Sequence, residues 1–222
     1  MNLLSSFLDL LFPPKCPFCG KILDAPGICP ACASSLPWVP DGDIVQDLPG
    51  GVPCAAPLRY EDAVRQALLR FKFQGRSAAA RPLGELIAQC AAEHFSGEFD
   101  TVAWVPVSRK RLRQRGYDQA ELLARSACRL WGVQPEKLLE KQRDNPAQSG
   151  LESAAARREN VAGVYQARNA AGKRVLLIDD ICTTGSTLAA CAQALTEAGA
   201  ERVVCAAVAR TFQEKVHSSV KE

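Results

Sequence analysis

Residues 175–187 read VLLIDDICTTGST: an apolar run, two acids, a turn rich in hydroxyl groups, and the beginning of a helix. A near-continuous apolar run such as residues 173–178 is typical of a strand in the middle of a parallel sheet that is covered on both faces. The pattern predicts a helix over residues 186–198 and a second apolar strand over residues 202–209. Strand, helix and strand in this order predict a parallel α/β sheet flanked by helices.

The turn between this strand and its helix has the chemistry of a phosphate site. Backbone N–H groups at a helix N-terminus attract an anion, and Gly185 allows a ligand to come close to the backbone. Further hydroxyl donors come from Thr183, Thr184, Ser186 and Thr187. Asp179 and Asp180 would repel a phosphate, so we expect this pair to hold sugar hydroxyls or a metal ion. A turn that binds nothing is the alternative, but it would leave two like charges side by side without a partner.

The same residues resemble the signature with which type I phosphoribosyltransferases bind 5-phosphoribosyl-1-pyrophosphate (PRPP). That signature has four apolar residues, Asp-Asp, two variable residues and Thr-Thr-Gly-x-Thr, whereas this sequence lacks the glycine patterns of Walker and dinucleotide-binding loops. The resemblance implies a type I phosphoribosyltransferase-like sheet. It also implies that the catalytic residues Asp179 and Asp180 hold the ribose 2′- and 3′-hydroxyls, that residues 183–187 bind the 5′-phosphate, and that Mg²⁺ binds together with PRPP.

A basic segment follows the apolar run at residues 101–107, which we predict to be a buried strand. Its cations are Arg109, Lys110, Arg111, Arg113 and Arg115. A run of this kind is usually a solvated surface loop. If the strand lies beside the Asp-Asp strand, however, the loop over residues 108–115 opens at the same edge of the sheet. Arg109, Arg111 and Arg115 are then candidates to bind the pyrophosphate, because guanidinium groups make paired hydrogen bonds to phosphate oxygens.

A wider part of the chain, from Val105-Pro106-Val107 to Arg115-Gly116-Tyr117-Asp118-Gln119, resembles the ComF family of phosphoribosyltransferase-like proteins associated with competence and DNA uptake. That family usually carries Pro-Val-Pro and Arg-Gly-Phe-Asn-Gln, so Ser108 and Tyr117-Asp118 depart from its pattern. Further matches lie at residues 71–75 and in the polar segment over residues 141–162. The resemblance implies a flexible hood at about residues 141–165. It also implies single-stranded DNA or a DNA-uptake helicase as candidate partners.

Four of the ten cysteines form two Cys-x-x-Cys pairs near the N-terminus. The pairs are Cys16 with Cys19 and Cys29 with Cys32. Four thiolates in so short a segment predict a closed tetrahedral Zn²⁺ site, and metal binding would supply the folding energy that a module with so small an apolar core lacks. An iron–sulfur site uses similar ligands and is an alternative, whereas a thioredoxin-like redox pair fits less well. We interpret Cys182, within the phosphate turn, as a small apolar side chain rather than a nucleophile.

The remaining sequence indicates how the 222 residues are divided. We predict an amphipathic helix (residues 3–12) followed by the zinc module within residues 1–40, a linker over residues 41–57, and a phosphoribosyltransferase-like domain over residues 58–222. The net charge of +3 does not by itself indicate a nucleic-acid partner. Because no apolar run is long enough for a membrane span and no signal peptide is recognisable, we expect a cytoplasmic protein.

Three functions are consistent with these features. The first is transfer of the 5-phosphoribosyl group of PRPP, in the presence of Mg²⁺, by displacement at C1 through an oxocarbenium-like centre, which is glycosyltransferase chemistry with an unknown acceptor. The second keeps the PRPP site without turnover, in a PRPP-responsive protein that handles single-stranded DNA. The third is a structural zinc-bearing adaptor. Binding of PRPP that is lost on substitution of Asp179 and Asp180 would support the first two functions, and release of pyrophosphate would separate transfer from binding. Failure to bind any phosphorylated sugar would favour the third.

Overall fold

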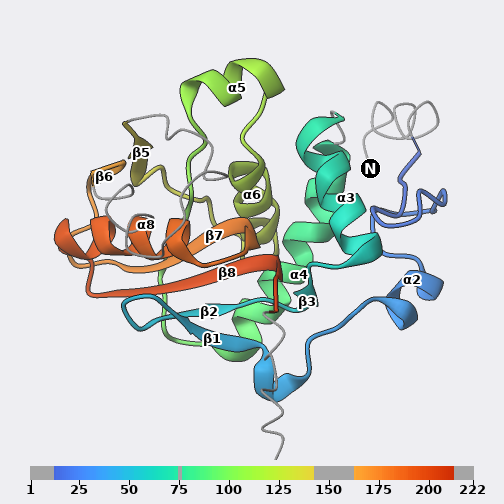
Figure 1. Ribbon diagram of the computed structural model, residues 1–222, viewed down its shortest axis with the longest axis horizontal. Coiled ribbons are helices and arrows are strands. Elements are labelled where there is room, and N and C mark those ends of the chain that lie inside the picture. Colours follow the sequence, from blue (N-terminus) through green and yellow to red (C-terminus); the bar gives the residue numbers. More distant parts are fainter. Residues whose placement is uncertain (1–12, 75–76, 143–162, 213–222) are drawn as a thin grey trace, which may run out of the picture.

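The computed structural model describes residues 13–74, 77–142 and 163–212. Its main sheet has the strand order β1-β2-β8-β7-β4, with β3 also paired to β8 (Figure 1). The strands are β1 (Val45–Leu48), β2 (Val52–Ala55), β3 (Leu58–Arg59), β4 (Thr101–Trp104), β7 (Arg174–Cys182) and β8 (Arg202–Arg210). All neighbours pair in parallel except β1 and β2, which form an antiparallel hairpin. The prediction of a parallel α/β sheet is confirmed.

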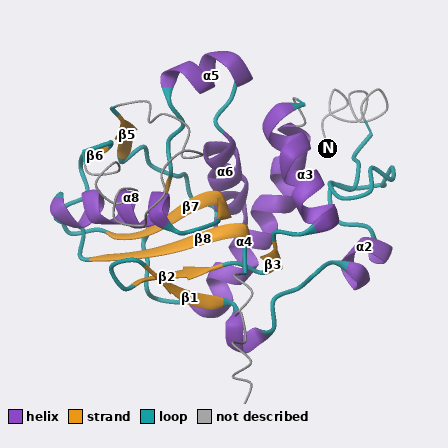
Figure 2. Cartoon of the chain, viewed as in Figure 1, coloured by secondary structure: helices purple, strands orange, loops and turns teal. Residues whose placement is uncertain are grey.

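Helices cover both faces of this sheet. The helices of the described residues are α2 (Pro30–Ser35), α3 (Asp62–Phe73), α4 (Ala80–His94), α5 (Arg109–Arg115), α6 (Gln119–Trp131) and α8 (Ser186–Glu197), with short 3-10 turns η1 (Asp41–Asp43) and η2 (Ser77–Ala79). Of these, α4, α6 and α8 cover the sheet. Figure 2 shows α8 in front of β7 and β8, with α4 and α6 behind them. Because successive side chains of a strand point to opposite faces, Leu176 and Ile178 join the core that contains residues of α4 and α6, while Leu177 joins the core beside α8. No helix in the described ranges is both long and apolar enough to cross a membrane.

A second, two-stranded sheet stands apart from the main one. It pairs β5 (Leu139–Lys141) with β6 (Tyr165–Ala167) in antiparallel register. The sequence pattern did not predict these strands, because three residues are too few to show a period. The expected hood at about residues 141–165 falls largely on residues 143–162, and the expected N-terminal helix falls on residues 3–12. Both of these ranges lie outside the described residues.

Three segments differ from the secondary structure expected of them. Residues 41–57, expected as a linker, contain η1 and the hairpin β1–β2, which extends the main sheet; the division of the chain into domains stays a prediction. The basic segment expected as a loop is helix α5, because Ser108 Oγ accepts a hydrogen bond from Arg111 N at its start and Gly116 ends it in the left-handed conformation. Strand β7 continues to Cys182, so both acids lie within it rather than after it.

Gly84 allows α4 to approach α6 closely. A Cβ atom at this position would lie 2.5 Å from Ser126 Cβ and 2.7 Å from Leu123 O. We expect Gly84→Ala to lower the free energy of unfolding by about 1–3 kcal/mol, because the two helices must separate within a packed core. Urea unfolding followed by circular dichroism measures this. The intrinsic preference of alanine for a helix works in the opposite direction, so a more stable variant would show that the two helices adjust without cost.

Candidate functional site

A cavity of about 330 Å³ opens at the carboxyl edge of the main sheet, where open α/β sheets bind their ligands. Its wall includes Asp179, Asp180, Thr183 and Thr187 from β7 and the turn before α8, together with Arg111 and Arg115 from α5. Strand β4 pairs in parallel with β7, with Trp104 opposite Ile178. This pairing brings α5, which follows β4, to the same edge as the acids. The expected meeting of the basic segment and the phosphate turn is therefore found in the structure.

The two acids of β7 have different surroundings. Asp180 is 5% exposed, and its Oδ2 lies 2.9 Å from Lys72 Nζ of α3. Asp179 is half-buried, and its Oδ1 accepts a hydrogen bond from Asp180 N at 2.8 Å. Burial, followed by the negative charge of Asp180, raises the pKa of Asp179 well above its ordinary value. The ionised form of Asp179 is therefore disfavoured in the free protein, and a ligand that donates hydrogen bonds to it would stabilise that form.

The turn over residues 183–187 has backbone donors left for a ligand. Thr184 Oγ1 and Ser186 Oγ lie 2.9 Å apart and bond to each other. The carbonyl oxygen of Thr183 accepts a hydrogen bond from Thr211 Oγ1 at 3.1 Å. Within the described residues, the N–H groups of Thr183 and Thr187 have no hydrogen-bond partner. An anion at the N-terminus of α8 would satisfy such groups and also benefit from the helix dipole.

Gly185 fixes the shape of this turn. It is the N-cap of α8 and has a φ of 71°, a left-handed conformation that favours glycine. A Cβ atom here would lie 2.6 Å from Leu48 Cδ2 of β1. The hairpin β1–β2 therefore packs directly against the turn, and both the backbone angle and the available space require glycine.

Arg115 and Gln119 belong to the other wall of the cavity. Arg115 Nη1 donates a hydrogen bond to Gln119 Oε1 at 2.7 Å, and its guanidinium lies 4.8 Å from the ring centroid of Phe73. Burial, followed by the nearby charge of Arg111, lowers the pKa of Arg115. Gln119 is 2% exposed, and in the described part of the chain its Nε2 has no hydrogen-bond partner. A buried donor without a partner is costly, so an acceptor from a ligand would stabilise this wall.

Asp118, where the resemblance leads one to expect asparagine, has a structural role. Its Oδ1 accepts hydrogen bonds from Ala120 N and Glu121 N at the start of α6, and its Oδ2 accepts one from Val107 N at 3.0 Å. These three bonds cap α6 and hold it to the segment after β4. Asp118 does not line the 330 Å³ cavity, so its charge is used within the protein.

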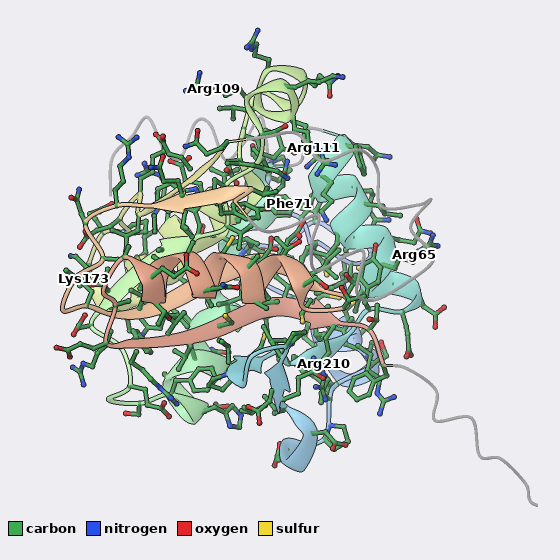
Figure 3. The ribbon with its side chains drawn as sticks, turned by 60° about the vertical axis from the view of Figure 1, so that its left-hand side comes forward. Arg65, Phe71, Arg109, Arg111, Lys173 and Arg210 are labelled. Carbon is green, nitrogen blue, oxygen red and sulfur yellow. The ribbon has the colours of Figure 1, made fainter. Side chains whose placement is uncertain are left out.

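Four of the predicted site residues do not line this cavity. Arg109 lines a neighbouring cavity of about 560 Å³ (Figure 3 labels Arg109 and Arg111 on α5). Thr184, Gly185 and Ser186 form the part of the turn between the two threonines that do line it.

Tyr60, Lys72 and Gln119 line the cavity but were not predicted as site residues. Lys72 and Gln119 fall in the segments of residues 71–75 and 115–119 that resemble the ComF family. A lysine between two phenylalanines, and a glutamine on the inner side of a helix, are the signals that could have drawn attention to them.

Cys182 is buried beside the phosphate turn. It is 1% exposed and belongs to the apolar core next to α8. The pKa of Cys182 is lowered, mainly by its contact with the Cys54 thiol. Burial raises this pKa, but Cys54 outweighs that effect, and a hydrogen bond from Gln46 lowers the pKa further. Among the residues that line the cavity there is no histidine to act as its base. These surroundings agree with the interpretation of Cys182 as a small core side chain.

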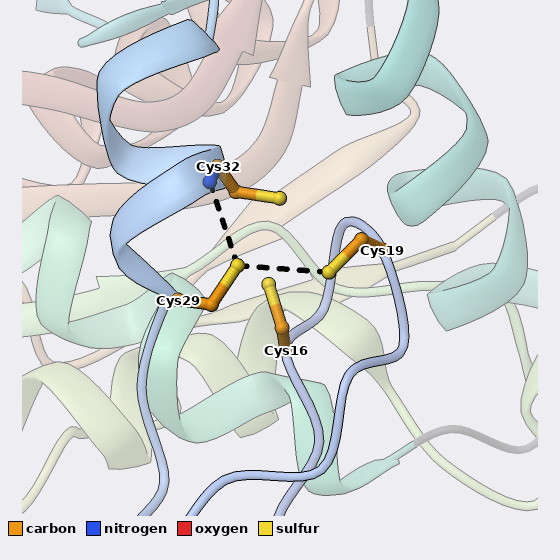
Figure 4. Close-up of side chains that lie close together, drawn as sticks. All are labelled: Cys16, Cys19, Cys29 and Cys32. Atoms are coloured by element: carbon orange, nitrogen blue, oxygen red, sulfur yellow. Dashed lines mark hydrogen bonds between the residues drawn. The ribbon is translucent and has the colours of Figure 1, made fainter.

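The four paired cysteines come together in the N-terminal module (Figure 4). The sulfur atoms of Cys16, Cys19, Cys29 and Cys32 all lie within 4.8 Å of one another. A tetrahedral site with Zn–S bonds of ~2.3 Å requires sulfur separations of ~3.8 Å, and Cys19 Sγ lies 3.6 Å from Cys29 Sγ. Cys29 also accepts a hydrogen bond from Cys32 N at 3.4 Å and caps α2. The donor set fits one ion with four ligands and no open position, as in structural zinc sites.

Comparison with known proteins covers both parts of the chain. Residues 114–221 match the family described as phosphoribosyl transferase domain, and residues 7–43 match the double zinc ribbon domain. The competence protein ComFC of Bacillus subtilis (strain 168) is 25% identical over 191 residues, covering 83% of this chain and 72% of that protein. The DNA utilization protein YhgH of Salmonella typhimurium is 27% identical over 206 residues, covering 89% of this chain and 90% of that protein.

Among solved structures, this chain is similar to the Bacillus subtilis glutamine PRPP amidotransferase complexed with ADP and GMP. The alignment covers 62% of this chain and 30% of the amidotransferase chain. Its TM-score is 0.43 and its sequence identity 25%. The two family matches, together with the parallel sheet and the four gathered cysteines, confirm the predicted phosphoribosyltransferase-like domain and zinc module.

Proposed function

Because the chain belongs to the ComF family and joins a zinc module to a phosphoribosyltransferase-like domain, we propose that it binds PRPP with Mg²⁺ and either transfers the 5-phosphoribosyl group or binds it without transfer. One observation carries the proposal. A single cavity collects the two acids of β7, two threonines of the phosphate turn and two arginines of α5. These groups match the hydroxyls, the 5′-phosphate and the pyrophosphate of one ligand.

Each wall of the cavity has a role in this proposal. Asp179 and Asp180 accept hydrogen bonds from the ribose hydroxyls. Residues 183–187, with the N–H groups of Thr183 and Thr187 that are unpaired within the described residues, bind the 5′-phosphate. Arg111, Arg115 and the free Gln119 amide bind the pyrophosphate. The C1–O bond to pyrophosphate then breaks with its electron pair on the departing oxygen, and a lone pair of the acceptor forms the new bond to C1. Preorganised donors around the departing pyrophosphate lower the barrier for this step.

The residues present suit a magnesium ion bound together with PRPP. The charge of Asp180 is offset by Lys72, at 2.9 Å, which leaves Asp179 as the acid whose ionised form a bound cation would favour. Carboxylate and phosphate oxygens are the ligands that Mg²⁺ prefers. When bound, the ion would neutralise the developing charge of pyrophosphate.

Calorimetric titration with PRPP tests the proposal directly. We expect saturable binding in the presence of Mg²⁺ and none in its absence. Ribose 5-phosphate should bind at least about tenfold more weakly, because it leaves the donors of α5 and Gln119 without acceptors. Equal affinity for the two ligands would contradict the role given to α5. A search for released pyrophosphate in the presence of candidate bases then distinguishes transfer from binding.

A second candidate function rests on the outer face of α5. Arg109, Lys110 and Arg113 are exposed there, next to the exposed apolar side chain of Leu112. Such a surface suits single-stranded DNA, and the relative YhgH is named a DNA utilization protein. The affinity for a single-stranded oligonucleotide should fall as the salt concentration rises. A plot of the logarithm of the binding constant against the logarithm of the salt concentration should have a slope of about −0.7 for each phosphate contact. Binding that survives loss of both β7 acids would separate this function from the first.

A further inference from the structure

We propose that Arg70 is a positioning residue through which the four-cysteine module sets the affinity of the β7 acids for PRPP. The proposal rests on the proposed function, because it concerns the same site. Its basis is the last turn of α3, where three consecutive residues contact three different parts of the protein.

Arg70 joins α3 to the cysteine module. Its Nη2 donates hydrogen bonds to Pro17 O at 3.1 Å and to Phe18 O at 2.8 Å. Both carbonyl groups belong to the two-residue loop between the metal ligands Cys16 and Cys19. A metal ion held by the two flanking thiolates would therefore fix the position of these acceptors.

The next two residues connect the same turn to the core and to the cavity. Phe71 is fully buried, and its carbonyl oxygen accepts a hydrogen bond from Tyr117 Oη. Lys72 Nζ lies 2.9 Å from Asp180 Oδ2. Successive residues of a helix are rotated by about 100°, so a change in the direction of Arg70 about the fixed Phe71 also moves Lys72.

Lys72 matters because it offsets one of two adjacent negative charges. With Lys72 in place, Asp180 is paired and Asp179 is also partly relieved, since the lysine charge opposes the rise of its pKa. If Lys72 moves away, the carboxylates repel each other more strongly, and the pair is less well arranged to accept hydrogen bonds from ribose. The affinity for PRPP should therefore depend on the contact between the cysteine module and α3.

Arg70→Met provides the test, with Arg65→Met as the matched control. Arg65 lies on the same helix (Figure 3), and its exposed side chain makes no hydrogen bond or ion pair with any other described residue. In zinc-loaded protein titrated with PRPP and Mg²⁺, we expect Arg70→Met to bind about fivefold more weakly or worse, and Arg65→Met to bind as the unaltered protein does. Equal affinities of the two variants would overturn the proposal.

A double-variant cycle separates positioning from a general loss of stability. If Arg70 acts through Lys72, Arg70→Met should have little further effect in a protein that already carries Lys72→Met. Effects that simply add would show that Arg70 acts by another route, and would overturn the proposal.

The unaltered protein gives a second readout, which holds even if Arg70→Met does not fold. Coupling between two sites is reciprocal, so saturating PRPP with Mg²⁺ should tighten zinc binding by the factor by which zinc tightens PRPP binding. Competition with a zinc-selective chelator measures this, and Lys72→Met should abolish the effect. If the protein binds PRPP but its zinc affinity is the same with and without PRPP, the proposal is overturned and the proposed function is not. Absence of PRPP binding in the unaltered protein would instead refute the proposed function, and the coupling with it.

Discussion

The double substitution Asp179→Asn/Asp180→Asn is expected to abolish Mg²⁺-dependent binding of PRPP. A hydrogen bond to a charged group contributes roughly 1.5–3 kcal/mol, so loss of two such bonds to the ribose hydroxyls corresponds to a fall in affinity of about 100-fold or more. The amides that replace the acids also remove the charge that favours Mg²⁺ beside the ligand. Calorimetric titration with PRPP and Mg²⁺ measures the loss.

A control with the same change in charge is available at the opposite edge of the sheet. Glu98 is half-buried and pairs with Arg202 at 2.7 Å, and Asp100 is exposed and pairs with Arg174 at 3.1 Å. Glu98→Gln/Asp100→Asn therefore removes two negative charges far from the cavity and should leave PRPP affinity unchanged. If the β7 variant kept its affinity for PRPP, the assignment of the site would be refuted.

The single substitution Asp179→Asn is expected to stabilise the free protein at neutral pH. A loss of PRPP binding in this variant could therefore not be explained by unfolding. The pKa of Asp179 is raised in the folded state by burial and by Asp180. As the pH rises above the ordinary carboxyl pKa of about 3.9, the unfolded chain loses its proton first, so the free energy of unfolding falls until the raised pKa is passed. Asparagine removes this fall. Urea unfolding at several pH values measures the difference.

Removal of zinc is expected to unfold the N-terminal module and to destabilise the domain on which it packs. Phe18, Leu36 and Val39 of the module are at most 6% exposed and belong to the same core as residues of α3 and α4. Their exposure costs about 1.5–3 kcal/mol each, and every kcal/mol lowers the melting temperature of a chain of this size by about 2–4 °C. We therefore expect chelation to lower the melting temperature by about 10 °C or more.

Metal analysis and thermal unfolding before and after chelation test this expectation. Cys19→Ser should lose the ion and reproduce the effect of chelation, because three thiolates no longer close the site. Cys90→Ala, which also removes a thiol but from the buried face of α4, should keep one zinc per chain. A metal-free protein with an unchanged melting temperature would contradict the expected role of zinc. Iron in place of zinc would favour the iron–sulfur alternative.

The elements predicted correctly from the sequence are those whose pattern is complete within one segment. The apolar run of β7, the helix α8 and the cysteine pairs each carry their signal locally. Helix α5 was interpreted as a loop because its charges suggested a solvated run, whereas arginine, leucine and glutamine all favour a helix once Ser108 and Gly116 cap it.

The parts that could not be predicted depend on contacts between distant residues. Lys72 and Asp180 are 108 positions apart and meet only because α3 lies at the carboxyl edge of the sheet. The hairpin β1–β2 was interpreted as a linker because prolines, glycines and aspartates surround short strands. Pairing of β2 with β8, not local propensity, makes these residues part of the sheet.

The packing of Leu48 against Gly185 has a practical consequence for anyone who shortens this protein. A truncated protein that begins at Leu58 would lack β1 and β2. It would also lack Leu48, which packs against the turn over residues 183–187. It would also leave β8 with an uncovered edge, which invites aggregation. A minimal fragment that keeps the turn over residues 183–187 in place therefore has to start ahead of Ile44, even though none of the residues gained in this way is expected to touch a ligand.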